Sequence, residues 1–401
     1  MSEASKTAGS KPGALDGIKI LEVANYITGP YAAMLLADLG AEVIKVEVPG
    51  QGDPFRGWGG DAYSPTFCGL NRNKRSFTLN VQLPEGKKIF LELAATADVV
   101  IENMRPGVGE RLGIGYEAVR AVNPLIVYCS ISGYGSDGPY RERPGYDTIG
   151  QAMGGLLGVL TDLDEPKGVG APLSDLLTGM YACYAIQGGL LARERHGIGQ
   201  KVETSLLQAT VAFGADNAVR FLATGNIPDR KHRVHMAQVY ACVGSDTLPF
   251  VIHLSSPQKF WENLCACVGR PDLVKDARFV DLESRIHNYD ALHDILQDAF
   301  AKQPRQHWIE ALIGRDVPVA PILNLKEVFE DPQVKHLGMV SPMTHPKMGP
   351  MNLLSSGIRM SETPPVMRLP PPMLGENSEE ILATLGYEAA AVAALRKGGV
   401  I

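Results

Sequence analysis

A single acidic residue, Asp175, precedes a long stretch of the sequence that carries no charge. The residues from Leu176 to Ala192 contain no Asp, Glu, Lys or Arg, which predicts a largely buried helix. Two roles for the acid stay open at this point. Ser and Asp are frequent helix N-caps, so Ser174 or Asp175 would serve as the cap. A helix N-terminus also favours negative charge, which would keep the carboxylate ionised and ready for nucleophilic attack.

Basic residues gather beside two of the predicted strands. Arg72, Lys74 and Arg75 precede the third strand, and Arg105 and Arg111 follow the fourth. Ligands of α/β proteins bind at the carboxyl ends of the strands, and arginine binds phosphate through two parallel hydrogen bonds. A phosphate-binding groove and a solvated loop with ordinary salt bridges fit these residues equally well.

Other kinds of chemistry have weaker support in the sequence. The turn Asn25–Pro30 lacks the GxGxxG pattern of a dinucleotide site, although Glu47 follows at the spacing of a ribose-binding acid. No GxSxG nucleophile elbow occurs. His232 and His235 lie in a basic run, for which a charged loop is a better interpretation than a metal site. We therefore expect no metal and no nicotinamide or flavin cofactor.

The bulk composition is that of an ordinary globular protein. The 401 residues are 45% hydrophobic and 20% charged, and the formal net charge of -6 does not favour nucleic acid as a partner. Six scattered cysteines without a CxxC pair indicate reduced thiols and a cytoplasmic location. We find no apolar run of about 20 residues that would span a membrane, and we expect residues 1–14 to form a flexible tail.

Apolar and amphipathic segments alternate along the first part of the chain. This alternation predicts a parallel sheet with helices on both faces. We expect strands at residues 18–23, 42–46, 77–80, 98–101 and 125–131 and helices at 31–39, 84–96 and 116–122. Longer helices are expected at 145–160, 176–194 and 203–222.

The pattern changes near residue 225. A hairpin of strands 239–243 and 248–253 is expected there, and helices are expected at 258–268, 289–302, 305–314, 326–330, 378–385 and 388–397. The predicted fold is α/β, with a Rossmann-like parallel sheet in a large domain plus a smaller α+β domain. We assign residues 15–225 to the large domain, 226–325 to the small domain and 326–401 to a return to the large domain.

Several short blocks of the sequence are informative through their order and spacing. The blocks are Asp16–Glu22, Gly29–Pro30, Leu39–Glu47, Asn71–Ser76, Pro84–Gly86, Ala97–Asn103, Ser132–Gly135, Gly197–Val202 and Leu374–Glu376. Together they resemble the class III (family III) CoA-transferases, which are CaiB/BaiF-like and include formyl-CoA transferase. The resemblance runs from about Leu15 to the C-terminus.

The resemblance assigns the chemistry to Asp175, because the family has its nucleophilic aspartate just ahead of a long apolar helix. It implies coenzyme A or acyl-CoA as a substrate, a small carboxylic acid as the acceptor, and no tightly bound cofactor. The implied CoA contacts are Tyr26, Ile27, Thr28, Leu79, Asn103, Arg111 and Tyr146. Lys74 and Arg75 belong to a matched block, and their contact with phosphate is our own inference.

Two departures from the formyl-CoA transferase pattern bear on specificity. Val48 follows Glu47 where that pattern has an arginine, and the Gly-rich active-site loop has no clear counterpart after Asp229. Neither formyl nor oxalate specificity is therefore predicted. The α-methylacyl-CoA racemases share the fold but use a His-Asp pair where this chain has Tyr146 and Asp147, so a transferase is favoured. A racemase-like enzyme and a non-catalytic CoA-binding module remain the alternatives.

The resemblance also implies a path for the reaction and an assembly. The reaction would pass through a mixed aspartyl anhydride and an aspartyl-CoA thioester. Two ring-like protomers would interlock as a homodimer. His253, Ser255 and Gln258 are candidates to recognise the acyl group, and a structural role for them is equally open. The sequence names neither the acyl-CoA donor nor the acceptor acid.

Overall fold

The computed structural model describes residues 11–58, 64–255 and 258–401. The chain divides into two compact units, which we describe separately. The first unit is formed by Met1–Leu157, Gly168–Ala215 and Gly338–Ile401, and the second by Gly158–Lys167 and Asp216–Leu337. Both sequence-based domain boundaries, at 225 and 325, fall within the second unit. Most of the predicted tail, residues 1–10, lies outside the described residues.

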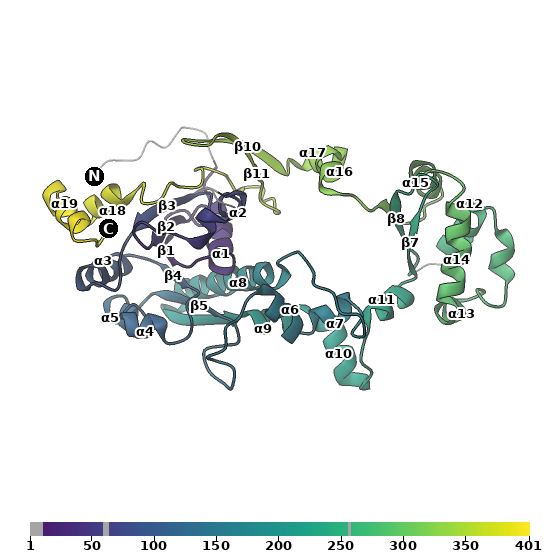
Figure 1. The fold of residues 1–401 in the computed structure, drawn as a ribbon, viewed down its shortest axis with the longest axis horizontal. Coiled ribbons are helices and arrows are strands. Elements are labelled where there is room, and N and C mark those ends of the chain that lie inside the picture. The colour runs from purple at the N-terminus through teal and green to yellow at the C-terminus, as the bar shows by residue number, and fades with distance from the viewer. Residues whose placement is uncertain (1–10, 59–63, 256–257) are drawn as a thin grey trace. The chain divides into compact units, whose positions relative to one another are not determined.

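A six-stranded parallel sheet is the centre of the described first unit (Figure 1). Its strand order is β3-β2-β1-β4-β5-β6, which is the order of doubly wound nucleotide-binding folds. The predicted α/β class with a parallel sheet is confirmed. The direction of winding changes between β1 and β4, where such folds have a ligand crevice. The strands are β1 (Lys19–Val23), β2 (Glu42–Glu47), β3 (Lys74–Thr78), β4 (Val99–Glu102), β5 (Val127–Ser132) and β6 (Gln200–Ser205).

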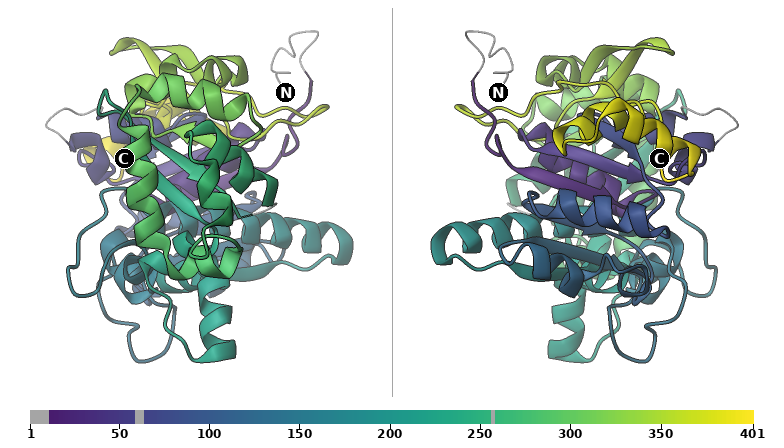
Figure 2. Two further views of the ribbon diagram at one scale, coloured as in Figure 1. Left: turned by 90° about the vertical axis from the view of Figure 1, so that its right-hand side faces the viewer. Right: turned by 90° about the vertical axis from the view of Figure 1, so that its left-hand side faces the viewer.

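Helices cover both faces of this sheet because successive side chains of each strand point to opposite faces. Ile20 packs into a core with α1 (Thr28–Asp38) and α8 (Leu173–His196). Leu21 packs into the opposite core with α3 (Pro84–Ala94). The second core also receives residues from α18 (Ser378–Thr384) and α19 (Ala389–Lys397), the yellow helices beside the sheet in Figure 2.

Shorter elements complete the first unit. Most of them connect the strands of the sheet, and β10 pairs with β11 as a hairpin. The segments beside these elements include loops at the carboxyl edge of the sheet. The shorter elements are η1 (Pro54–Gly57), α2 (Pro65–Leu70), α4 (Val108–Leu112), α5 (Tyr116–Val122), α6 (Asp147–Met153), α9 (Leu206–Phe213), β10 (Val340–His345) and β11 (Gly349–Leu354). Helices α7 (Leu156–Leu160) and α10 (Ala215–Thr224) begin in the first unit and continue into the second.

Two of the predicted long helices are wrong in extent. The segment 203–222 starts as strand β6, whose last residue Ser205 then caps α9 by accepting a hydrogen bond from the Gln208 N–H at 3.1 Å. The segment 145–160 is interrupted between α6 and α7, where Gly155 has a φ of 79°. Glycine adopts this left-handed conformation without a steric cost, so the chain turns there instead of continuing as a helix.

The second unit contains an antiparallel sheet of three strands in its described part. The predicted hairpin of β7 (Val239–Val243) and β8 (Pro249–His253) is confirmed, and β9 (Val319–Pro321) adds to β8. Helices pack against this sheet around Trp261. They are α11 (Arg230–Met236), α12 (Gln258–Cys267), η2 (Pro271–Lys275), α13 (Leu282–His287), α14 (Tyr289–Phe300) and α15 (Arg305–Ile313). The helices α16 (Leu325–Glu330) and α17 (Pro332–Leu337) follow them in the chain and contribute none of the described residues of this core.

No helix in the ranges that the structure describes combines the length and apolarity that crossing a membrane requires.

Candidate active site

A pocket of about 220 Å³ opens at the carboxyl edge of the parallel sheet. Its walls come from the residues that follow β1, β4 and β5, together with the loop ahead of α6 and the first turn of α8. This is the position that the strand order indicates for a ligand. The lining residues are Tyr26–Thr28, Asn103–Pro106, Ile131–Gly133, Arg141, Arg143–Tyr146, Asp175 and Leu206.

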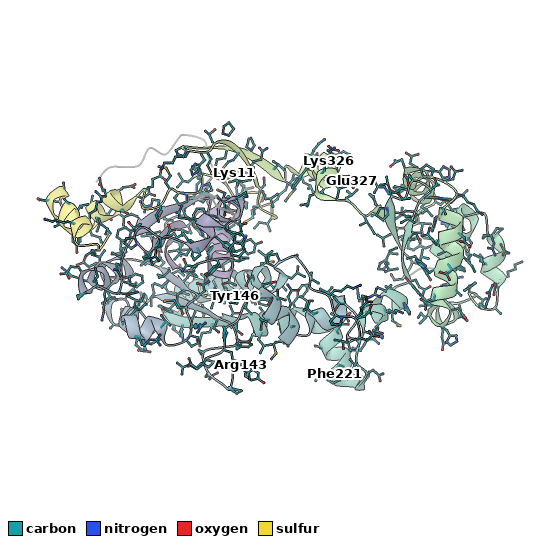
Figure 3. All side chains as sticks on the ribbon, in the orientation of Figure 1. Lys11, Arg143, Tyr146, Phe221, Lys326 and Glu327 are labelled. Carbon is teal, nitrogen blue, oxygen red and sulfur yellow. The ribbon has the colours of Figure 1, made fainter. Side chains whose placement is uncertain are left out.

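Asp175 and five of the predicted CoA contacts line this one pocket. The five are Tyr26, Ile27, Thr28, Asn103 and Tyr146. They come from three separate stretches of the sequence, so the fold brings them together. Figure 3 labels Tyr146 at the start of α6.

Three further predicted contacts do not line the pocket. Leu79 is buried in the core on the α3 face of the sheet, with 2% of its surface exposed. Arg75 pairs with Glu380 of α18 at 3.0 Å. Arg111 is exposed on α4. Their proposed contact with CoA therefore has no support from the geometry of this pocket.

Lys74 was predicted to bind phosphate, and its position argues against that role. Its ammonium group is fully buried, 2.7 Å from a carboxylate oxygen of Glu22, and donates to the backbone oxygen of Pro30 at 2.8 Å. Burial lowers the pKa of Lys74 to about 8, and the Glu22 carboxylate opposes this shift. The charge holds protein groups together and is not presented to a ligand.

Arginine side chains give the pocket a cationic wall. Arg105, Arg141 and Arg143 all line it among the described residues. Arg143 also stacks on Tyr140, with 3.8 Å between the guanidinium carbon and the ring centroid. The sequence pattern indicated Arg105, which closely follows a predicted strand. It did not indicate Arg141 and Arg143, because they lie within a long loop, away from the end of β5. The Arg-Glu-Arg-Pro run itself was the available signal.

Asp175 is the third residue of α8 and does not cap it. The N-cap position is occupied by Pro172, whose own side chain makes no capping hydrogen bond. The Ser174 hydroxyl instead lies 2.5 Å from the Thr210 hydroxyl. The capping role that the sequence left open for Ser174 or Asp175 is therefore wrong, and the carboxylate of Asp175 is available to the pocket.

The surroundings of Asp175 favour its protonated form. Burial raises the pKa of Asp175 to about 7, and the nearby carboxylate of Asp147 contributes in the same direction. The prediction that the helix N-terminus keeps this group fully ionised is thus corrected, since desolvation and a like charge outweigh the helix dipole. Near neutral pH roughly half of the molecules carry the nucleophilic carboxylate.

Asp147 is held in a short chain of hydrogen bonds. Its Oδ1 accepts the backbone N–H of Asp175 at 3.2 Å, and its Oδ2 accepts from the Gln151 amide at 2.5 Å. The same amide nitrogen donates to the backbone oxygen of Ala171 at 3.0 Å. These contacts tie the start of α8 to α6 and so fix the backbone that carries the nucleophile.

The turn between β1 and α1 forms the opposite wall and is conformationally unusual. Tyr26 has a φ of 66°, which costs a non-glycine residue roughly 1–2 kcal/mol. Asn103 stabilises the turn by accepting the Asn25 N–H at 3.0 Å and donating to the Asn25 backbone oxygen at 2.7 Å and the Thr28 hydroxyl at 3.2 Å. The predicted ligand residue Asn103 therefore also shapes the pocket.

The candidates for acyl recognition lie in the second unit. His253 Nε2 is 2.9 Å from the Ser255 hydroxyl, and the Gln258 amide oxygen accepts from Arg285 at 3.3 Å. Their role with substrate stays a prediction. Within the described residues no cluster of three or more His, Cys, Asp or Glu side chains has the arrangement of a metal site.

A carboxylate with a raised pKa opposite several arginines suits nucleophilic attack on a polyanionic substrate. Comparison with known families identifies that chemistry. The model of CoA-transferase family III matches residues 15–378 of this chain. The chain belongs to CoA-transferase family III. The resemblance seen in the sequence blocks is thereby confirmed, and the protein is an enzyme that acts on CoA thioesters and carboxylic acids.

Individual family III CoA-transferases are similar over most of their length. Succinyl-CoA:glutarate CoA-transferase of Homo sapiens is 36% identical over 393 residues, which cover 96% of this chain and 90% of the relative. Acetyl-CoA:oxalate CoA-transferase of Acetobacter aceti is 38% identical over 343 residues, covering 84% and 87%. The crystal structure of a CaiB/BaiF family protein from Brucella suis superposes with a TM-score of 0.83 at 35% identity, covering 94% and 100%.

Proposed function

We propose that this family III CoA-transferase moves CoA from a dicarboxylic acyl-CoA, such as succinyl-CoA, to a second dicarboxylic acid through Asp175. The observation that carries the proposal is the carboxylate of Asp175 in one pocket with Arg105, Arg141 and Arg143. The names of the relatives support the substrate class, since succinyl-CoA, glutarate, oxalate and mesaconate are all derived from dicarboxylic acids.

The first half of the reaction loads CoA onto the enzyme. A carboxylate oxygen of Asp175 attacks the thioester carbonyl carbon and forms a carbon–oxygen bond, the carbon–sulfur bond breaks, and CoA leaves as the thiolate. A mixed anhydride between Asp175 and the donor acid remains. The thiolate then attacks the Asp175 carbonyl carbon of that anhydride. The carbon–oxygen bond breaks, the donor acid leaves as its carboxylate, and Asp175 becomes an aspartyl-CoA thioester.

The second half repeats these steps in reverse order. The acceptor carboxylate attacks the aspartyl thioester and releases the thiolate, which then attacks the acceptor carbonyl of the new anhydride. The acceptor leaves as its CoA thioester, and Asp175 returns to a carboxylate. One thioester is broken and one is formed, so the overall transfer requires no nucleoside triphosphate. Water must stay out of the pocket during these steps, because it would hydrolyse both intermediates.

The pocket walls supply the remaining functions in this proposal. Tyr26–Thr28, Asn103 and Tyr146 contact CoA, and the arginines bind its phosphates or the distal carboxylate of the acid. Negative charge develops on the carbonyl oxygen in each attack. In this proposal Ser132 and Gly133, which line the same pocket, stabilise that charge together with the arginine side chains.

We extend the proposal to a cytoplasmic, interlocked homodimer, as the family resemblance implies. Large apolar side chains are exposed on helices of the single chain, which supports a partner surface. On α8, Tyr184 is 74% exposed, and on α10, Leu222 is 79% exposed beside Phe221, which Figure 3 labels. Sedimentation of the purified protein at twice the chain mass would agree with the dimer, and a monomer would contradict it.

The aspartyl-CoA intermediate provides the decisive experiment. After incubation with succinyl-CoA, the peptide that contains Asp175 should gain the mass of CoA less one water, and hydroxylamine should remove it. Asp175→Ala should gain no mass and transfer no CoA while binding free CoA as tightly as the wild type. Full transfer activity in this variant would end the proposal.

A further inference from the structure

A cluster of buried charges packs against the turn that forms the pocket wall. Each side chain is at most 5% exposed, and its three carboxylates and three cations are formally neutral together. We call this set, drawn from the described residues, the buried charge cluster. Its members are Glu22, Lys45, Glu47, Asp53, Arg56 and Lys74.

Short ionic contacts connect the members of the buried charge cluster. Lys45 Nζ lies 2.7 Å from Glu22 Oε1 and 2.9 Å from Asp53 Oδ2. The second oxygen of Glu22 pairs with Lys74 at 2.7 Å. The Asp53 backbone N–H donates to Glu47 at 3.0 Å, which links the Glu47–Arg56 pair to the others. Buried ion pairs are weak contributors to stability, because desolvation offsets most of their attraction. The role of the cluster is therefore better judged from the backbone groups that it holds in place than from its contribution to the stability of the fold.

Three members of the cluster hold the backbone of the β1–α1 turn. Lys45 donates to the Ala24 backbone oxygen at 2.8 Å, and Lys74 donates to that of Pro30 at 2.8 Å. Between these two points, Asp53 Oδ1 accepts the backbone N–H of Tyr26 at 3.2 Å. The cluster thus contacts the turn at its beginning and at its most unusual residue, and it contacts α1 in the first turn of that helix.

The contact with Tyr26 explains how this residue keeps its left-handed conformation. In this conformation the Tyr26 N–H donates to Asp53 Oδ1, and the same carboxylate oxygen also accepts the Phe55 N–H at 2.9 Å. Without an acceptor at position 53, the strain at Tyr26 is no longer compensated. Tyr26, Ile27 and Thr28 would then relax and change the pocket wall they form.

We infer that Asp53, held by Lys45, is a positioning residue for the substrate pocket and acts through the backbone of Tyr26. The inference rests on the proposed function in one respect, the use of CoA as the ligand that the pocket binds. Asp53 itself does not line the pocket. Its effect is therefore expected in ligand affinity and not in the chemical step.

Binding of free CoA to the full chain, measured by isothermal titration calorimetry, tests this inference without turnover. Asp53→Ala should weaken CoA binding at least about tenfold, which corresponds to about 1.4 kcal/mol. Asp53→Asn should weaken it less, because its amide oxygen still accepts the Tyr26 N–H. Circular dichroism confirms that each variant is folded at the assay temperature.

The chain offers a matched control in a second buried ion pair. Asp38 accepts from Arg72 at 3.0 and 2.5 Å, both side chains are 4% exposed, and Asp38 lies at the end of α1 remote from the turn. Asp38→Asn removes an equivalent buried charge and should lower the melting temperature while leaving the Kd of CoA unchanged. Equal Kd values for Asp53→Ala and Asp38→Asn would overturn the inference. The proposed function would be unaffected, because the Asp175 adduct tests it separately.

A second variant keeps the test decisive if Asp53→Ala does not fold. The double variant Lys45→Met with Asp53→Leu removes one positive and one negative charge, so the rest of the cluster stays neutral. It loses the contact to Ala24 and the acceptor for the Tyr26 N–H and should weaken CoA binding, and an unchanged Kd would overturn the inference. A wild-type protein that binds no CoA would overturn the proposed function and this inference with it.

Discussion

The backbone N–H of Asp175 donates to the side chain of Asp147 at 3.2 Å, so a second carboxylate lies beside the first turn of α8 that carries the nucleophile. This contact positions the nucleophile, and the charge of Asp147 adds to burial, the larger cause, in raising the pKa of the Asp175 carboxyl group. The raised pKa has a direct kinetic consequence, because attack requires the ionised form of Asp175.

The rate of transfer should increase with pH through an apparent pKa near 7. The pKa of Asp175 is raised to about 7, so protonation removes the nucleophile as the pH falls below that value. Asp147→Asn removes the like charge and should move the profile to lower pH. The measurement is kcat/KM for succinyl-CoA over the range of about pH 5 to 9. A wild-type profile that stays flat to the acid end would contradict this prediction.

The ionised carboxylate of Asp175 should lower the free energy of unfolding at alkaline pH. Its folded-state pKa is raised, so the folded protein binds a proton that the unfolded chain releases, and stability falls as the pH rises toward 7. Asp175→Asn should therefore raise the free energy of unfolding by on the order of 2 kcal/mol at pH 8. The gain should shrink near pH 4. Thermal melts at the two pH values would show it, and an equal gain at both would refute this origin.

Arg143→Ala should raise the KM for acyl-CoA by about tenfold to 100-fold with a smaller change in kcat, because the guanidinium lines the pocket and suits phosphate or carboxylate. Arg120→Ala is the matched control. Arg120 is an exposed arginine of α5 whose ion pair with Glu117 is 3.9 Å long, and it does not line the pocket. Initial rates against acyl-CoA concentration separate the two variants, and equal KM values would contradict the assignment.

Gly150→Ala should destabilise the protein by about 1–3 kcal/mol and lower activity. A Cβ atom at Gly150 would lie 2.3 Å from the Ser174 hydroxyl, next to the nucleophile in α8. Gly188→Ala is the control within α8, since a Cβ there meets no atom within 4 Å. It should be neutral or stabilise the helix by up to about 1 kcal/mol. Chemical denaturation and transfer rates give both quantities, and a fully active Gly150→Ala would count against the packing argument.

Local patterns predicted most of the first unit because its strands are short, apolar and separated by amphipathic helices. They missed β6, whose residues Gln200–Ser205 are mostly polar, so only its pairing with β5 identifies it as a strand. The order of the strands also depends on contacts between distant segments. Gly155 ended a predicted helix through a conformation that a periodic pattern does not encode.

The site shows the same division between local and tertiary information. The resemblance to a family selected Asp175 as the nucleophile, whereas the residues alone favoured a helix cap. Lys74 was misinterpreted because a buried lysine and a surface lysine look identical in a sequence. Its position depends on Glu22, a residue of another strand. Arg141 and Arg143 were missed because a long loop carries no periodic signal.

The first unit also has a consequence for the synthesis of the protein. Its core on the α3 face includes Ile381, Leu382, Val392, Val400 and Ile401, which leave the ribosome long after the strands they cover. The second unit, formed mostly by Asp216–Leu337, is available to fold before that core is complete. One apolar face of the parallel sheet therefore stays uncovered until the C-terminal segment has been synthesised. During this interval the nascent chain is an expected client of chaperones that bind exposed hydrophobic surface.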